Sequence, residues 1–208
     1  MSLDGKIATA GGESRLSSFE DLERVHRIRA EVDGIMIGIG TLLADDPGLT
    51  VRLATGRSPQ RIVVDSKSRT PIDANVVRTA LETPTIIAVT SMAPEKRIRQ
   101  LQKAGVLVLR CGRGPSVSLP ILLRRLRVMG IKRILLEGGG SLSWSMLSSG
   151  LVDEVSVAIS PRILGGADAT TLVEGEGFKR IRNAIKLRLG SVRKYGEDLV
   201  VRYRVLTD

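Results

Sequence analysis

The sequence predicts a single α/β domain with a mixed, mainly parallel sheet, helices on both faces and an antiparallel hairpin near the carboxyl end. Short apolar runs rich in Val, Ile and Leu alternate with helical patterns, and the last two runs are separated only by a turn. Alternating strands and helices are typical of a covered parallel sheet, whereas strands joined by a turn pair antiparallel. No repeat or linker divides the chain, so we expect one domain over residues 1–208.

The expected parallel strands are buried, because their apolar residues are almost continuous. They span Gly34 to Ile39, Arg61 to Val64, Thr85 to Val89, Val106 to Leu109 and Arg133 to Leu136. Three further runs are also expected to be strands, at Glu154 to Ser160, Ile185 to Ser191 and Leu199 to Leu206. Residues 195–198 supply a turn, so we expect the last two strands to form a hairpin at one edge of the sheet.

Three helices are expected where apolar residues recur every three or four positions. The first runs from Ser18 to Val32, and Ser18 with Asp21 forms a plausible capping box at its start. The second carries Leu119, Leu122, Leu123 and Leu126 and stops at Gly130. The third runs from Ser141 to Ser149.

The composition excludes several classes of protein. Cys111 is the only cysteine and His26 the only histidine, so neither a disulfide framework, a Cys/His zinc site nor a zinc deaminase is expected. His26 is interpreted as an ordinary helix residue, because no nucleophile elbow accompanies it. The sequence has neither a stretch of roughly 20 apolar residues nor a leader pattern. We therefore expect a soluble, cytoplasmic protein that needs no metal and does not bind membranes.

The charge favours anionic partners. The formal net charge is +10, with 32 basic residues, which suits a phosphorylated metabolite, a phosphate-bearing cofactor or nucleic acid. Aromatic residues make up only 2% of the chain and the basic residues are dispersed, so a nucleic-acid-binding protein is the less favoured interpretation.

The segment from Arg133 to Ser141 carries the strongest local signal. An apolar strand runs directly into Glu137 and three glycines, and a helix follows. Glycines let the backbone approach an anion, and the helix start offers unpaired N–H groups, so a pyrophosphate could rest there. A tight turn without a ligand is the alternative. Glu137 ends the strand, where it could face a reacting centre or merely anchor the glycine turn.

Residues 38–52 form a second cluster after a strand. Asp46-Pro47-Gly48 is a turn signal, which gives Asp46 a local structural role. We expect Thr41 and Asp45 on the loop past the strand end, where a hydroxyl and a carboxylate could bind ribose or amide groups.

Seven segments in order resemble the reductase of riboflavin biosynthesis, both its stand-alone archaeal and fungal form and the carboxyl-terminal domain of the bacterial deaminase-reductase. They are residues 1–6, 38–50, 61–66, 136–140, 150–154, 160–166 and 175–178. The resemblance implies a dihydrofolate-reductase-like fold, usually as a homodimer. It also implies a central strand ahead of Met1, or another segment in its place.

The resemblance further implies NADPH as cofactor, with NADH possible, and 2,5-diamino-6-ribosylamino-4(3H)-pyrimidinone 5′-phosphate as substrate. The implied cofactor contacts are Leu16, Thr41, Asp45, Ser66, Gly139, Gly140, Ser141, Leu142, Ser143, Trp144 and Ser145. The implied substrate contacts are Ser14, Arg29, Leu49, Arg52 and Glu137, with the two arginines on the 5′-phosphate. Lys6 is an implied active-site cation, and Lys6 or Glu137 would assist the reaction. The loop at residues 66–69 is a candidate for the 2′-phosphate of NADPH.

Competing hypotheses remain at this point. A dihydrofolate or pterin reductase would share fold and cofactor but take a substrate without the sugar phosphate. A basic nucleic-acid-binding protein would show salt-dependent binding and no NADPH affinity. A third possibility is a protein that binds the cofactor without catalysis.

Overall fold

A computed structural model describes residues 1–206, which form two compact units. The first unit contains Met1–Val25 and the chain from Gly140 onward, and the second contains His26–Gly139. The boundary falls inside helix α1 (Phe19–Glu31), so the first turns of α1 are described with the first unit and its last turns with the second.

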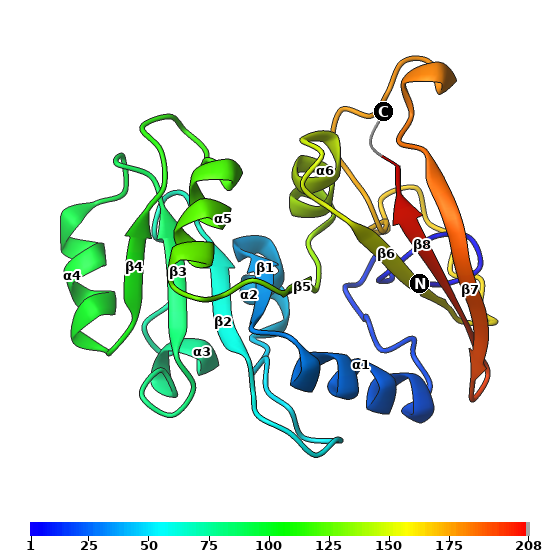
Figure 1. The fold of residues 1–208 in the computed structure, drawn as a ribbon, viewed down its shortest axis with the longest axis horizontal. Helices are drawn as coiled ribbons and strands as arrows, with labels where there is room; N and C mark the ends of the chain where they lie inside the picture. Colours follow the sequence, from blue (N-terminus) through cyan, green and yellow to red (C-terminus); the bar gives the residue numbers. More distant parts are fainter. Residues whose placement is uncertain (207–208) are drawn as a thin grey trace. The chain divides into compact units, whose positions relative to one another are not determined.

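The second unit is built on a five-stranded parallel sheet of order β4-β3-β2-β1-β5 (Figure 1). Its strands are β1 (Gly34–Gly38), β2 (Gln60–Val64), β3 (Thr85–Val89), β4 (Leu107–Arg110) and β5 (Ile134–Leu136). Its helices are α2 (Ile39–Asp45), α3 (Asn75–Arg78), α4 (Glu95–Lys103) and α5 (Leu119–Val128). Ile37 and Val63 on one face of the sheet, and Met36 and Ile62 on the other, are fully buried, so both faces of the central strands are covered.

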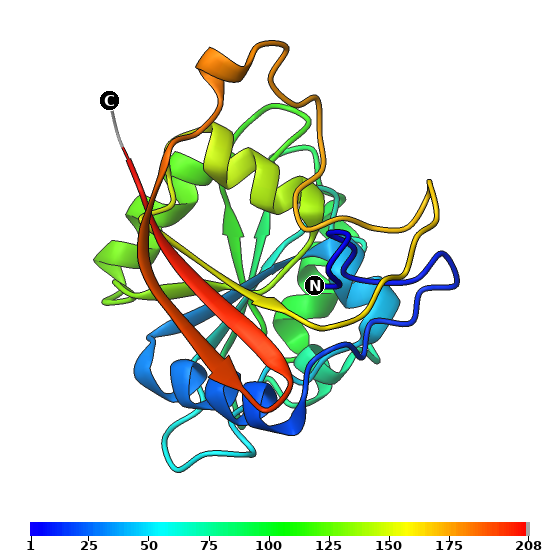
Figure 2. The ribbon, with the colours of Figure 1, turned by 90° about the vertical axis from the view of Figure 1, so that its right-hand side faces the viewer.

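The first unit contains a three-stranded antiparallel sheet of order β6-β8-β7. Its strands are β6 (Glu154–Ile159), β7 (Leu187–Tyr195) and β8 (Asp198–Val205), accompanied by α6 (Gly140–Ser148) and a short 3₁₀ helix, η1 (Ile181–Asn183). Figure 2 shows the β7–β8 hairpin in orange and red, toward the viewer. Its turn is Gly196-Glu197, where Gly196 has a φ of 55°, a conformation that suits glycine.

The fold class expected from the sequence is confirmed, with four corrections. The hairpin does not lie at an edge of the parallel sheet; it pairs with β6 in a sheet of its own. β7 continues to Tyr195 instead of ending at Ser191. Residues 39–45 are helical instead of forming a loop, and the short helices α3 and α4 were not expected. Within residues 1–206, none of the helices has the length and apolar character needed to cross a membrane.

Candidate active site

The carboxyl edge of the parallel sheet gathers several of the expected site residues in the second unit. Glu137 follows β5, α2 with Thr41 follows β1, and Ser66 lies two residues beyond the end of β2. These strands are parallel neighbours in the order β2-β1-β5, so their carboxyl ends meet at one edge. The Glu137 backbone is fixed there, because its N–H donates to the carbonyl of Met36 on β1 at 2.9 Å.

Glu137 forms a bidentate pair with Arg29 from the end of α1. Arg29 Nε donates to Oε1 at 2.7 Å and Nη2 to Oε2 at 2.5 Å. Both side chains are largely buried, with exposed fractions of 13% for Arg29 and 17% for Glu137. A bidentate guanidinium–carboxylate pair is short and directional, so each side chain orients the other.

The pairing limits what Arg29 can offer a phosphate. Its Nη1 also donates to the carbonyl of Thr50 at 3.0 Å, so three of the five guanidinium N–H groups are engaged and two are left. Arg52, in contrast, is exposed, and no hydrogen bond or ion pair involves its guanidinium within residues 1–206. Of the two arginines expected on the phosphate, Arg52 is therefore the one whose donors are free.

The segment that carries Leu49 and Arg52 is anchored to the core at Gly48 and Leu49. Leu49 is 3% exposed and has a φ of 52°, an uncommon value for a residue with a branched side chain. The preceding carbonyl, Gly48, accepts a hydrogen bond of 3.3 Å from Arg61, which is fully buried. Burial lowers the pKa of Arg61 to about 10. Because the Leu49 side chain belongs to the core, a substrate would meet this residue through its backbone.

The glycine corner has the backbone conformation that the sequence suggested. Gly138 and Gly139 have φ values of 113° and 88°, which side-chain-bearing residues rarely adopt. A Cβ placed on Gly138 would lie 3.7 Å from the hydroxyl oxygen of Thr41, so Thr41 borders this corner. Thr41 and Asp45 both lie on α2 and not on a loop, and Asp45 is exposed at its end.

The loop after β2 contains Ser66 and the basic pair Lys67 and Arg69. The Ser66 hydroxyl oxygen accepts a hydrogen bond from the Val117 N–H at 3.1 Å, and its carbonyl accepts one from Thr90 N–H at 3.1 Å. Ser68 has a φ of 55°, and its buried hydroxyl has no partner within the described residues. The loop is thus tied at Ser66 by two hydrogen bonds and carries two exposed cations, of which Arg69 lies 3.8 Å from the buried Asp65 carboxylate.

In the first unit, α6 begins at Gly140 and carries most of the expected cofactor contacts. A Cβ on Gly140 would lie 2.6 Å from Cγ of Glu174, whose N–H donates to the Gly140 carbonyl at 3.1 Å. Trp144 packs edge-on against Phe178, with ring centroids 4.9 Å apart, and a Cβ on Gly175 would overlap its indole. The Ser145 hydroxyl donates to the Ser141 carbonyl at 2.9 Å. Trp144 and Ser145 therefore have structural partners of their own, while Ser141 and Ser143 remain partly or fully exposed.

Lys6, Ser14 and Leu16 also lie in the first unit. Lys6 Nζ donates to the Ala169 carbonyl at 3.1 Å, which leaves two of its three N–H donors. Its backbone forms an isolated bridge with Thr171. Ser14 is exposed, whereas Leu16 is 8% exposed and its carbonyl accepts a hydrogen bond from Arg162 at 2.8 Å. A ligand would thus reach Ser14 and Lys6 more easily than the Leu16 side chain.

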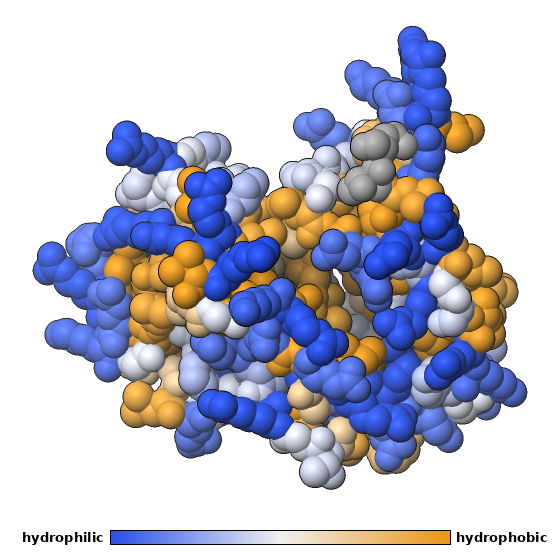
Figure 3. All heavy atoms as spheres, viewed as in Figure 1, coloured by the Kyte–Doolittle hydropathy of each residue, from blue (hydrophilic) through white to orange (hydrophobic). Residues whose placement is uncertain are grey.

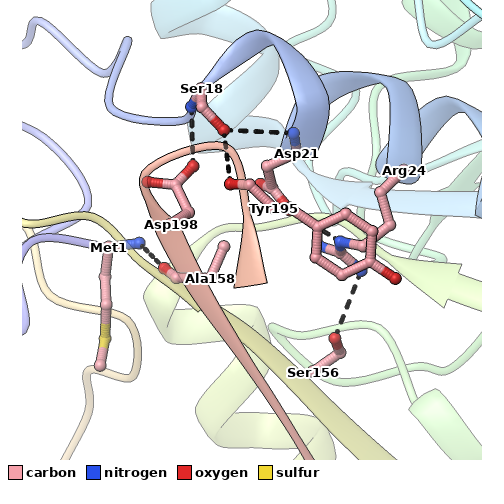
Figure 4. Close-up of polar contacts among 8 residues, drawn as sticks. All are labelled: Met1, Ser18, Asp21, Arg24, Ser156, Ala158, Tyr195 and Asp198. Carbon is pink, nitrogen blue, oxygen red and sulfur yellow. Dashed lines mark hydrogen bonds and ion pairs between the residues drawn. The ribbon is translucent and has the colours of Figure 1, made fainter. Parts of the chain in front are cut away.

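The start of α1 is capped as expected, though only half of the capping box forms (Figure 4). The Ser18 hydroxyl accepts a hydrogen bond of 3.3 Å from the Asp21 N–H. The second bond of a capping box, from the Ser18 N–H to the Asp21 carboxylate, does not form. The Ser18 N–H donates to Asp198 at 2.7 Å instead, and the Asp21 carboxylate accepts from Arg24 at 2.7 Å. Asp21 is 1% exposed and therefore a structural residue of α1.

Sequence reasoning missed one side chain beside the Arg29–Glu137 pair. His26 was interpreted as an ordinary helix residue, yet its Nδ1 accepts a hydrogen bond of 2.9 Å from the Arg52 N–H. The available signal was its position three residues before Arg29 on α1, which places both on one helix face.

These features define an α/β protein with a glycine-lined strand-to-helix corner and an arginine–glutamate pair at the carboxyl edge of a parallel sheet. The family model of the RibD C-terminal domain matches residues 1–201, and the chain belongs to this family.

Known relatives agree with this assignment. The chain is 51% identical to the 2,5-diamino-6-ribosylamino-4(3H)-pyrimidinone 5′-phosphate reductase of Methanothermobacter thermautotrophicus over 99% of this chain and 94% of the relative. It is 44% identical to the riboflavin biosynthesis protein RibD of Actinobacillus pleuropneumoniae, of which it spans 55%. Among solved structures, Acinetobacter baumannii RibD superposes with a TM-score of 0.85 at 26% identity, covering 99% of this chain and 55% of that one. The chain thus spans nearly all of the archaeal reductase and about half of RibD.

Proposed function

We propose that this chain, acting as one reductase domain over residues 1–208, reduces the ribose of 2,5-diamino-6-ribosylamino-4(3H)-pyrimidinone 5′-phosphate to the ribitylamino product with NADPH. The observation that carries the proposal is the 51% identity, over 99% of this chain, to a relative named for that substrate. Three relatives that match nearly the whole chain are all named as the pyrimidinone 5′-phosphate reductase, so the hypothesis of a dihydrofolate or pterin reductase is not favoured.

The residues of the second unit suit a phosphorylated sugar. Arg52 offers a free guanidinium for the 5′-phosphate, and Arg29 keeps two N–H donors for the same group. Arg29 holds the Glu137 carboxylate in one orientation. In that orientation the carboxylate can accept hydrogen bonds from sugar hydroxyls or from the glycosylamine N–H. Lys6 lies in the first unit, and we assign it the role of a cation or proton donor in the reaction.

A dinucleotide fits the donor set of the chain. The positive φ values of Gly138 and Gly139 leave that corner without side chains, and the start of α6 supplies backbone N–H groups for a pyrophosphate. Bound NADPH supplies a hydride, which together with one proton converts the C=N bond of the ring-opened imine into the CH₂–NH of the product. The preference for NADPH over NADH is assigned to Lys67 and Arg69, which lie on the exposed loop after β2 and suit a 2′-phosphate.

The test is a turnover assay with purified protein, the ribosylamine phosphate and either NADPH or NADH, following the reduced nicotinamide. We expect oxidation with the pyrimidine substrate, no oxidation with dihydrofolate, and a higher KM for NADH. The double variant K67S/R69S should raise the KM for NADPH and leave that for NADH unchanged. Oxidation of the cofactor with dihydrofolate and not with the ribosylamine would contradict the proposal.

We also propose that the protein is a homodimer that pairs through the antiparallel sheet. Residues opposite one another across a ladder share a face, and alternate residues along a strand do so too. The register places on one face Val155, Val157, Ile159, Leu187, Leu189, Val192, Leu199, Val201, Tyr203 and Val205, together with Lys194. Leu189 and Val192 are three residues apart and would point to opposite sides in a regular strand, but the bulge between Leu189 and Ser191 places both on this face.

This face carries little charge, and although Val157 and Val201 are buried, its residues on β7 and at the start of β8 are exposed. Leu187, Leu189, Val192 and Leu199 are 42%, 57%, 50% and 44% exposed. Hydrophobic surface is visible along the right-hand edge of Figure 3, where Figure 1 places β7. Two copies that each carry a net charge of +10 repel one another, and a face whose register includes one charged residue, Lys194, minimises that repulsion.

Sedimentation tests the dimer. The wild-type protein should sediment as a dimer, and the variant Leu189→Lys as a monomer, because it buries a charge at the centre of the face. The matched control Arg193→Ser changes the opposite face of the same strand and should remain dimeric. A monomeric wild type, or a dimeric Leu189→Lys, would contradict this interface.

A further inference from the structure

Residues 50–52 of the second unit lie outside any helix or strand, and side chains hold their backbone. The Thr50 carbonyl accepts a hydrogen bond from Arg29 at 3.0 Å, and the Val51 N–H donates to the Ser58 hydroxyl at 3.1 Å. The Arg52 N–H donates to His26 Nδ1 at 2.9 Å. Three consecutive residues are thus each tied to a different side chain, which fixes the direction in which the Arg52 side chain leaves the backbone.

His26 is buried, at 4% exposure, and accepts through Nδ1. An imidazole nitrogen accepts a hydrogen bond only when it carries no proton, so the tie to Arg52 requires the neutral ring with its proton on Nε2. Protonation of Nδ1 would place two donors against one another and break the tie.

The surroundings of His26 favour that neutral ring. Burial lowers its pKa most, and the positive charges of Arg29 on α1 and of Arg52 on the loop lower it further. Glu137 at the end of β5 acts in the opposite direction. The ring therefore stays neutral at and above neutral pH, and it becomes charged only as the pH falls below the ordinary histidine pKa of about 6.5.

Arg52 and Arg29 differ in what orients their side chains. The Arg29 guanidinium is already oriented by Glu137, whereas the exposed Arg52 guanidinium has no partner within residues 1–206. The position of Arg52 is consequently set at its backbone, and His26 holds the backbone atom of that very residue.

We propose that His26 is a positioning residue, which holds the Arg52 backbone so that the Arg52 guanidinium meets the 5′-phosphate of the substrate. The inference rests on the proposed function for the identity of that phosphate. His26 touches neither substrate nor cofactor in this account. It should therefore affect the affinity for the phosphorylated substrate and not the hydride-transfer step.

Two substitutions of similar polarity separate this role from a general effect on folding. The amide oxygen of Asn is two bonds from Cβ, as Nδ1 is, so His26→Asn keeps an acceptor for the Arg52 N–H. The amide oxygen of Gln is three bonds away, where Nε2 lies, so His26→Gln loses that acceptor. We expect His26→Gln to raise the KM for the ribosylamine phosphate roughly three- to tenfold, the effect of one lost hydrogen bond. Its kcat and its KM for NADPH should stay within about twofold of wild type, and His26→Asn should resemble wild type.

The pH profile provides a readout that a merely structural role would not change. As the pH falls below about 6.5, the wild-type KM for the substrate should rise more steeply than that of His26→Asn, which cannot be protonated in this range. Titration of the substrate phosphate affects both proteins equally and cancels in the ratio. Because His26 is the only histidine in the chain, its NMR titration reports this pKa directly.

The outcomes distinguish this inference from the proposed function. If wild type turns over but His26→Gln and His26→Asn have the same KM, the inference is wrong and the function stands. If wild type does not reduce the ribosylamine phosphate, the proposed function fails, and calorimetric binding of ribose 5-phosphate decides the role of His26. Weaker binding by His26→Gln than by His26→Asn then supports the positioning role, and equal binding overturns it.

Discussion

The two sheets of this protein differ in how far they bury their side chains. Strands β1, β2 and β3 of the parallel sheet bury residues on both faces, and polar groups collect at their carboxyl edge. Strand β7 of the antiparallel sheet exposes most of its nine residues. The parallel sheet therefore forms the buried core of its unit, whereas β7 leaves most of its side chains on the surface.

The largest difference is expected for core truncations. Ile87 on β3 is fully buried, so Ile87→Ala should lower the free energy of unfolding by about 2–5 kcal/mol through lost burial and a residual cavity. Leu189 on β7 is 57% exposed, and Leu189→Ala should cost less than about 0.5 kcal/mol. Chemical denaturation in dilute protein, where the monomer prevails, measures both. Equal losses would mean that the two sheets do not differ as described.

The ion pairs of the two units should differ next. Glu137→Gln breaks a largely buried bidentate pair with Arg29 and should cost up to about 3 kcal/mol, because a buried guanidinium loses its counter-charge. Glu154 pairs with Arg202 on the antiparallel sheet, where both side chains are more than half exposed. Glu154→Gln should therefore cost at most about 1 kcal/mol. A double-mutant cycle with Arg29→Met would test whether the first loss comes from the pair itself.

Glycine substitutions compare the glycine corner with Gly150, which follows α6. Gly138→Ala and Gly150→Ala both place a side chain at positive φ, 113° and 65°, without a steric clash. Each should lower stability by about 1–3 kcal/mol. Only Gly138→Ala should weaken NADPH binding, measured by fluorescence titration of the protein. Weakened binding in both variants would indicate a general loss of structure.

The smallest effect concerns Asp4 in the first unit. Hydrogen bonds from Ser2 and from the N–H groups of Leu164 and Gly165 lower the pKa of Asp4 to about 2. Since this folded-state pKa lies below the unfolded value of 3.8, the carboxylate stabilises the fold above about pH 4, and the contribution disappears as the pH falls towards 2. Asp4→Asn should thus be less stable than wild type at pH 7 and equally stable near pH 2. A difference that is independent of pH would contradict this origin.

The buried strands could be predicted from the sequence, because apolar runs such as Thr85–Val89 leave few other interpretations. Helix α2 was missed because Gly40, Thr41 and the Asp-Pro turn dominate the local pattern. Helix α4 was missed because its buried residues are only Ile98 and Leu101. The separate sheet could not be foreseen, since strand order depends on contacts that local patterns do not contain.

At the site, the position of Glu137 followed from the strand it ends. Its pairing with Arg29, 108 residues away, could not be read from local sequence, and neither could the contact between His26 and Arg52. The roles of Lys6, Thr41, Ser66 and the residues of α6 stay predictions. Side-chain contacts across the fold, and not residue type alone, decided that Arg29 is occupied and Arg52 is free.

Isotope transfer tests the central claim most directly. The protein would be incubated with the ribosylamine phosphate and NADPH deuterated at the hydride-donating C4 position, and the product analysed by mass spectrometry. We predict one deuterium, located at C1′ of the ribityl chain, and a much slower reaction for Glu137→Gln and Arg52→Ala. Folded protein that yields no labelled ribitylamino product, or a label outside C1′, would contradict the account.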